Sequence, residues 1–175
     1  MRLVWCTGLP GAGKSTLCRL LAGSPIHVQD ADEDGFSRRR WRRGRGTGWV
    51  PDAVELDWAT QEWALDVDHA AALRRLPHDV GVLFGIVANE REARPLFDAV
   101  AFLDAGPATL THRLLTRTGN DYGRRPGELE DVLRWARGAR RLHERHGDVI
   151  IPNDGGPDHA LERLLDLCDE VAHRR

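Results

Sequence analysis

The sequence predicts one three-layer α/β domain in which helices cover both faces of a five-stranded parallel sheet. Short apolar segments alternate along the chain with longer amphipathic ones. A glycine-rich run separates the first apolar segment from the helical segment that follows it. The chain has 175 residues, of which 41% are hydrophobic, and it contains no stretch typical of a linker. We therefore expect residues 1–175 to form a single domain with one sizeable core.

Each predicted element follows from this alternation. The expected strands are residues 3–6, 26–29, 80–84, 99–103 and 148–151. The expected helices are residues 14–22, 51–76, 108–116, 128–146 and 158–172. The helix over residues 51–76 is predicted because apolar residues recur there at helical spacing after a proline. Such a topology has right-handed crossovers and places a ligand crevice at the carboxyl ends of the strands.

Composition excludes several classes of function. The 25 basic and 27 acidic residues give a formal net charge of -2, so the chain lacks the strongly positive field of a general nucleic-acid binder. Its three cysteines do not show the paired spacing of a metal site. The sequence shows neither a signal-like apolar segment nor a spanning one. We expect a reduced, cytoplasmic protein without a membrane partner.

A phosphate-binding motif connects the first strand to the first helix. The run is Gly8-Leu9-Pro10-Gly11-Ala12-Gly13-Lys14-Ser15-Thr16, which satisfies G-x-x-x-x-G-K-[ST], the Walker A or P-loop pattern. Small residues allow backbone N–H groups to surround a phosphate at the helix N-terminus. We expect Lys14, the only lysine of the chain, to reach the β- and γ-phosphates of ATP and the Ser15 hydroxyl to bind Mg²⁺. The motif predicts nucleotide binding but does not specify a reaction.

The chain resembles the small-molecule P-loop kinases, a group that includes shikimate, gluconate, adenylate and nucleoside kinases. The features that carry the resemblance are the P-loop, the Asp30-x-Asp32 pair after the second strand, and Leu103-Asp104-Ala105 before a helix with Arg113 and Arg117. Together they cover most of the chain. The resemblance implies an ATP- and Mg²⁺-dependent phosphotransferase whose acceptor is a hydroxyl group of a small molecule, such as a nucleoside or a related metabolite.

The resemblance also implies roles for the two carboxylates. Asp30 is expected to order the water shell of the metal, and Asp32 to hold or deprotonate the acceptor hydroxyl. Alternate residues leaving a strand can point into the same crevice, which fits this division. The other interpretation is a solvated acidic turn that also contains Glu33 and Asp34.

A lid is expected at residues 118–127. In the kinases that the chain resembles, this segment closes over ATP and brings arginines to the phosphates. Arg113 and Arg117 lie four residues apart on one helix face before it. The resemblance suggests that Arg117 stacks on adenine or contacts phosphate and that Arg124 or Arg125 enters the site on closure. For each single arginine, a surface charge is the alternative.

A loop after the fifth strand carries Asn153 and Asp154. In kinases of this type the equivalent loop often packs beside adenine, so both residues are candidates for contacts to the base. An ordinary turn before the last helix is the alternative.

Residues 33–76 are the expected acceptor-binding region. Six arginines occur among residues 38–45, beginning at Arg38 and flanking Trp41. This patch fits a nucleotide, a phosphorylated substrate or the end of a nucleic acid. A solvated helix or a disordered loop is the alternative. Trp63, on the helix expected at residues 51–76, forms either an aromatic wall of the site or part of the core.

The end of the third strand enters the same crevice. Gly85 permits close approach of a substrate, and Asn89 offers both a donor and an acceptor. The sequence departs from the kinase pattern here, because many relatives have an acidic residue where this chain has Phe84-Gly85. This departure keeps open a second hypothesis, an ATP-binding switch protein with little phosphotransfer. A kinase of nucleic-acid 5′-hydroxyl ends is the third.

Overall fold

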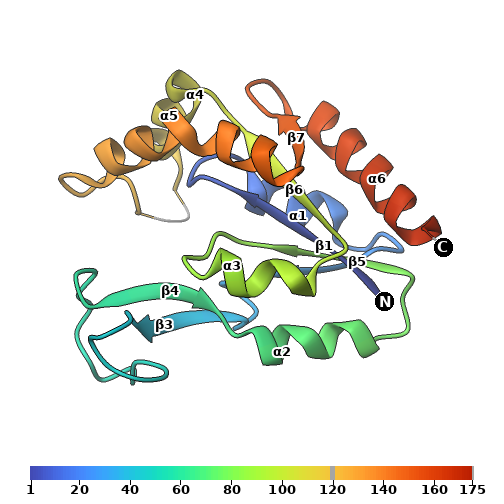
Figure 1. Cartoon of the computed structure of the whole chain (residues 1–175). Helices are drawn as coiled ribbons and strands as arrows, with labels where there is room; N and C mark the ends of the chain where they lie inside the picture. The colour runs from blue at the N-terminus through green and yellow to red at the C-terminus, as the bar shows by residue number, and fades with distance from the viewer. Residues whose placement is uncertain (119–120, 175) are drawn as a thin grey trace.

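The structure, a computed structural model, describes residues 1–118 and 121–174. In this part of the chain, five strands form one parallel sheet in the order β2-β5-β1-β6-β7 (Figure 1). The strands, in sheet order, are His27–Asp30, Val80–Phe84, Arg2–Gly8, Ala99–Asp104 and Val149–Pro152. The predicted five-stranded parallel sheet is therefore confirmed, with each strand close to its expected position.

Helices flank the sheet on both faces (Figure 1). The α-helices α1 to α6 are Lys14–Leu21, Val67–Ala71, Glu90–Ala93, Pro107–Thr116, Glu128–His146 and Pro157–His173. Two 3-10 helices, η1 and η2, are Ala72–Arg75 and Arg94–Leu96. Helices α1 and α6 pack on one face of the sheet, and η1 and η2 pack on the other. Helix α5 contributes Val132 to the first of these clusters and stacks His143 on Phe102 of β6. Within the described residues, no helix is long and apolar enough to cross a membrane.

Two apolar clusters hold the layers together. Along β1, Val4 and Cys6 point into the cluster under α1 and α6, whereas Leu3 and Trp5 point into the cluster on the opposite face. This alternation follows from the two-residue period of a strand. Burial on both faces makes the strand a continuous apolar run, which is why its position could be predicted.

The expected long helix at residues 51–76 is wrong. The segment contributes β4 (Gln61–Leu65), which pairs antiparallel with β3 (Ser37–Trp41) in a separate two-stranded sheet. Only α2 and η1, after β4, are helical. Arg38, Arg39 and Arg40 thus lie in β3, and the other arginines of the run, Arg42, Arg43 and Arg45, follow the strand in the loop before β4.

Local hydrogen bonds explain why the helical pattern fails. Asp57 accepts from the backbone N–H of Ala59 and from the Thr60 hydroxyl, which makes a turn before β4. Asp66 caps α2 by accepting from the His69 N–H at 3.1 Å, so the helix begins after β4. Between these signals the backbone pairs with β3. Tertiary pairing therefore overrides the apolar period.

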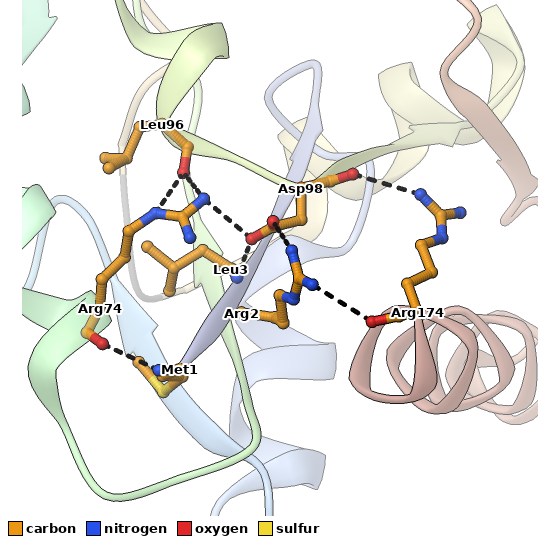
Figure 2. A network of polar contacts seen from close by, with 7 residues as sticks. All are labelled: Met1, Arg2, Leu3, Arg74, Leu96, Asp98 and Arg174. Atoms are coloured by element: carbon orange, nitrogen blue, oxygen red, sulfur yellow. Dashed lines mark hydrogen bonds and ion pairs between the residues drawn. The ribbon is translucent and has the colours of Figure 1, made fainter.

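A polar network lies at the amino ends of the central strands, at the end of the sheet opposite the P-loop (Figure 2). Asp98 accepts from the Leu3 N–H at 2.8 Å and from the guanidinium groups of Arg2 and Arg74 at 3.0 and 2.9 Å. Arg174, just after α6, donates to the Asp98 carbonyl oxygen. Burial raises the pKa of Asp98, but these hydrogen bonds outweigh burial and lower it. The network joins the beginning of β1 to β6 and to the C-terminal helix.

Candidate active site

The P-loop leaves β1 at Gly8 and enters α1 at Lys14. A Cβ atom on residue 8 would lie 2.8 Å from the Leu103 carbonyl oxygen, and one on residue 13 would lie 2.4 Å from Asn153 Nδ2. Gly13 also has a φ of 107°, in the left-handed region. The predicted glycine loop is therefore built as a tight turn that excludes side chains and exposes backbone N–H groups at the beginning of α1.

Lys14 is the first residue of α1, just beyond the carboxyl end of β1. Its ammonium group donates to the carbonyl oxygens of Gly8 at 2.6 Å and of Leu9 at 3.2 Å. Desolvation lowers the pKa of Lys14 to about 8, and the negative charges of Asp32 and Asp30 oppose this shift. Asp30, the last residue of β2, and Asp32 lie at the same end of the sheet as the P-loop, and their roles toward a metal and an acceptor stay predictions.

Two residues brace the P-loop from outside. The buried Asn153 donates its side-chain N–H to the Ala12 carbonyl oxygen at 2.7 Å. Arg113 donates to the same oxygen at 3.4 Å and to the Gly155 carbonyl oxygen at 2.9 Å. Both residues lie beside the P-loop and hold its backbone. Their contacts with a bound nucleotide stay a prediction.

The carboxylate of Asp154, next to Asn153, forms hydrogen bonds with residues at the beginning of α4. Its carboxylate accepts from the Gly106 N–H and from the Thr109 hydroxyl, both at 2.7 Å. These two hydrogen bonds lower the pKa of Asp154. The alternative of a local turn describes the observed geometry, and a contact between Asp154 and a base stays a prediction.

Asp30 and Asp32 leave the carboxyl end of β2. Asp30 is buried, and its Oδ1 accepts from the backbone N–H groups of Asp32 at 3.0 Å and Glu33 at 3.3 Å. Asp34 Oδ2 in turn accepts from the Asp30 N–H at 2.8 Å. The acidic run therefore forms a compact turn in which Asp30 organises the backbone that carries Asp32.

Asp32 is exposed to solvent, but its carboxylate has one hydrogen-bond partner in a strand. The indole Nε1–H of Trp63, from β4, donates to Asp32 Oδ1 at 2.7 Å. Desolvation by the surrounding protein raises the pKa of Asp32, the Trp63 hydrogen bond lowers it in part, and the net shift is upward. The site thus contains a carboxylate that a fixed donor holds beside the phosphate cradle.

The oxygen donors near the P-loop fit a Mg²⁺ site. Ser15 is exposed in the first turn of α1. Both hydrogen bonds that the Asp30 carboxylate accepts go to its Oδ1. Mg²⁺ prefers oxygen ligands, keeps several waters and commonly binds substrate phosphates. In the described part of the chain, no group of three or more His, Cys, Asp or Glu side chains is placed to hold a metal ion.

The segment expected to be a lid connects α4 to α5, and two of its residues, 119 and 120, lie outside the described residues. Arg117 donates to the Tyr122 carbonyl oxygen, and Arg124 donates to the Arg117 carbonyl oxygen. Glu128 accepts from the Gly123 N–H at 2.7 Å. Desolvation and the positive charge of Arg124 lower the pKa of Arg117.

Arg117 also faces the P-loop electrostatically. Its positive charge contributes to the lowered pKa of Lys14. Arg117 and Lys14, both positively charged, therefore repel each other electrostatically. An anionic ligand between them would relieve this repulsion. The closure of a lid stays a prediction.

Gly85 and Asn89, the two residues after β5 that were predicted to contact a substrate, both have a role in the fold. A Cβ atom on residue 85 would lie 2.8 Å from the Ala31 Cβ, so Gly85 lets β5 approach the segment after β2. The Asn89 side chain is buried, accepts from the Leu65 N–H at 2.8 Å and donates to the Leu65 carbonyl oxygen at 3.0 Å. The Asn89 side chain thus hydrogen-bonds to the backbone of β4 as a neighbouring strand would. Direct contacts of Gly85 and Asn89 with a substrate stay predictions.

Four arginines of the predicted basic patch have partners within the hairpin or beside it. Arg38 pairs with Asp66 at 2.7 Å and lies over the Trp49 ring, 4.2 Å from its centroid. Arg40 pairs with Glu62 and Glu92, both at 2.6 Å. Arg39 and Arg42 donate to carbonyl oxygens of the loop between β3 and β4, and Arg42 also donates to that of Gln61, the first residue of β4.

These contacts identify the function of the arginine run in the fold. Arg39 reaches the carbonyl oxygen of Val54 at 2.7 Å, and Arg42 reaches that of Gln61 at 2.8 Å. The guanidinium groups therefore fold the long loop back onto the hairpin. The contact of Arg38 with a substrate, predicted from the sequence, stays a prediction.

Sequence reasoning missed the role of Trp63. The residue was assigned to a helical face, where it is either core or an aromatic wall, and its bond to Asp32 was not expected. The turn at Asp57 and the cap at Asp66 were the available signals, because together they define a short segment with two ends. The geometry adds Trp63 to the candidate site.

The fold and the glycine loop together define a P-loop protein of the three-layer α/β class. The family whose sequence model matches the chain is described as "AAA domain", and the match covers residues 4–135. The chain belongs to this family. No curated protein matches the chain in sequence.

Two solved structures share the fold along nearly the whole chain. Shikimate kinase from Acinetobacter baumannii, in complex with shikimate, is 14% identical over 99% of this chain and 96% of that one, with a TM-score of 0.64. TT1252 from Thermus thermophilus is 18% identical over 95% of each chain, with a TM-score of 0.57. The resemblance to small-molecule P-loop kinases is thus confirmed for the fold.

Proposed function

We propose that the protein transfers the γ-phosphoryl group of ATP to a hydroxyl group of a small molecule. The observation that carries this proposal is the arrangement of the strand ends: β2 ends at Asp30, β1 leads into the P-loop with Lys14, and Cys6 of β1 and Asp30 both lie opposite Phe84 of β5. A phosphate cradle holds the donor, and a carboxylate beside it orients the acceptor. This combination is what phosphoryl transfer to a hydroxyl group requires.

The bond changes assign a task to each residue. The acceptor oxygen forms a bond to the γ-phosphorus, the bond from that phosphorus to the bridging oxygen breaks, and ADP leaves with the electron pair. Asp32 orients the hydroxyl group and takes its proton. Lys14 and the backbone N–H groups of the P-loop hold the transferred group. Arg117 and Arg124 would neutralise its charge from the other side.

Mg²⁺ would offset phosphate charge in this reaction. Ser15 would supply a hydroxyl ligand, and Asp30 would hold a water of the metal shell. Asn153, Asp154 and Arg113 would line the nucleotide side, because all three lie where β7 and α4 meet the P-loop.

A small molecule is favoured over a nucleic-acid end as the acceptor. The reason for considering nucleic acid was the arginine run, and Arg38, Arg39, Arg40 and Arg42 bind groups of the hairpin region and Glu92 instead. The complex of the Acinetobacter baumannii enzyme with shikimate, a small hydroxylated compound, supports the same choice.

An ATP-binding switch is the second candidate. Strand β5 ends at Phe84 and is followed by Gly85, so neither residue offers a carboxylate to a metal at that position. This function would need the P-loop but no acceptor chemistry at Asp32.

Incubation of the protein with ATP, Mg²⁺ and a panel of nucleosides and polyols tests the proposal. Acceptor-dependent ADP formation and a new phosphomonoester signal in ³¹P NMR are expected. The Lys14→Ala variant is the control for contaminating kinases. ATP-dependent thermal stabilisation without acceptor-dependent turnover for any panel member would favour the switch.

A further inference from the structure

The hydrogen bond between Trp63 and Asp32 has no role in the reaction steps proposed above. The distance from Trp63 Nε1 to Asp32 Oδ1 is 2.7 Å, at the short end for an N–H···O bond. A carboxylate acceptor makes such a bond shorter and stronger than a neutral one. Among the residues that the structure describes, the Trp63 indole is the only hydrogen-bond donor to the Asp32 side chain.

The backbone around Trp63 is fixed to the main sheet. The Trp63 carbonyl oxygen accepts from the Ala88 N–H at 2.8 Å. Two residues further along β4, Leu65 exchanges two hydrogen bonds with the Asn89 side chain. Ala88 and Asn89 follow β5, which pairs with β2, the strand that leads to Asp32. The strand that carries the indole is therefore tied to the segment after β5, and the carboxylate follows β2, the strand that pairs with β5.

The other edge of β4 is equally constrained. Trp63 lies opposite Arg39 in the antiparallel ladder. The Arg39 guanidinium donates to the Val54 carbonyl oxygen and to the Gln61 side chain. The strand that carries the indole is thus held by β3 on one side and by the segment after β5 on the other, so the indole N–H has a defined direction.

We propose that Trp63 is a positioning residue for Asp32, which fixes Oδ1 of the carboxylate so that Oδ2 is presented to the acceptor hydroxyl. A carboxylate with one oxygen held cannot rotate freely, and orientation of this kind lowers the barrier to transfer. The inference relies on the proposed function only for the task of Asp32. The pairing itself can be tested on the protein alone.

NMR of the indole N–H groups tests the pairing without any turnover. The Trp63 N–H signal is expected downfield, and in Asp32→Ala it should move upfield and exchange faster with water. Asp32 is exposed, so we expect this variant to fold, and its thermal unfolding checks this. The Trp135 indole on α5, 46% exposed, is the internal control and should not move. A Trp63 signal that is the same in both proteins would overturn the inference.

Kinetics test the consequence with the acceptor that the panel identifies. Trp63→Phe keeps a ring and removes the N–H, and kcat should fall roughly 10- to 100-fold, the worth of a hydrogen bond to a charged group. KM for ATP should stay unchanged, because Trp63 lies on the acceptor side. In the Asp32→Ala background, Trp63→Phe should cost nothing more. Trp135→Phe is the matched control and should leave kcat unchanged.

The outcomes separate the inference from the function on which it relies. If the indole signal responds to Asp32→Ala but no acceptor is phosphorylated, the pairing stands and the proposed function fails. If the wild-type protein phosphorylates an acceptor and Trp63→Phe has the same kcat, the function stands and the positioning role is wrong. An equal loss from Trp63→Phe with and without the Asp32 carboxylate would also contradict a role through Asp32.

Discussion

Asn153, at the end of the last strand, holds the carbonyl oxygen of Ala12 at 2.7 Å and occupies the space beside Gly13. The P-loop is therefore supported from behind by a residue 141 positions later in the chain. This contact couples the cradle to β7, and it explains why residue 13 has no room for a side chain.

Gly13→Ala should abolish ATP binding and destabilise the protein. The new Cβ would lie 2.4 Å from Asn153 Nδ2, so the brace or the loop must move. Gly23→Ala is the matched control, because Gly23 also has a positive φ, of 85°, but nothing lies within 4 Å of its added Cβ. That variant should lose only about 1 kcal/mol of stability. Thermal unfolding with and without ATP measures both, and equal behaviour of the two variants would contradict the role of Asn153.

Asn89→Ala should loosen the hairpin from the main sheet. The buried N–H and carbonyl oxygen of Leu65 lose their partners, at a cost of roughly 1–3 kcal/mol for an unsatisfied group. Hydrogen exchange should accelerate in β4, while the amides of β1 stay protected. Unchanged exchange at Leu65 would show that Asn89 does not hold the strand.

A buried ion pair beneath α5 should make stability sensitive to acid. Asp148 has a side chain only 4% exposed and contacts Arg94 at 2.7 Å and His143 at 2.6 Å. Burial raises the pKa of Asp148, but hydrogen bonds from Arg94 and His143 outweigh burial and the net shift is downward. The carboxylate therefore stabilises the fold above the unfolded pKa of about 3.9, and this contribution is lost as pH falls through the lower folded pKa.

Urea unfolding of Asp148→Ala measures this contribution. At pH 7 the free energy of unfolding should fall by roughly 3 kcal/mol, because the mostly buried Arg94 loses its closest carboxylate and keeps only Glu90, at 3.4 Å. The difference from the wild-type protein should shrink as pH falls below the folded pKa. Asp166→Ala, which removes an exposed partner of Arg163, is the control and should cost less than about 1 kcal/mol. A difference that is constant down to low pH would contradict the assignment.

Features encoded by neighbouring residues could be predicted from the sequence. The P-loop depends on nine consecutive residues, and strand β1 is apolar on both faces, so both could be placed without knowledge of tertiary contacts. The placement of Asp30 and Asp32 at the same end of the sheet as the P-loop followed from the rule that parallel strands end at one edge.

Features that depend on distant partners could not be predicted. Trp63 and Asp32 are 31 residues apart, and only the pairing of β3 with β4 brings the indole to the carboxylate. The arginine run suggested a ligand because its partners, among them Glu92, come from other elements. Asn89 suggested a substrate contact because its hydrogen bonds to Leu65 require the hairpin to be in place.

Comparison of the wild-type protein with Asp32→Asn tests phosphoryl transfer to a hydroxyl group most directly. Both proteins are incubated with ATP, Mg²⁺ and the acceptor panel, and ATP affinity is measured in parallel. We predict acceptor-dependent ADP formation that falls roughly 100-fold or more in Asp32→Asn, with ATP affinity unchanged. ADP formation that ignores the acceptor and is equal in the two proteins would contradict the proposed function.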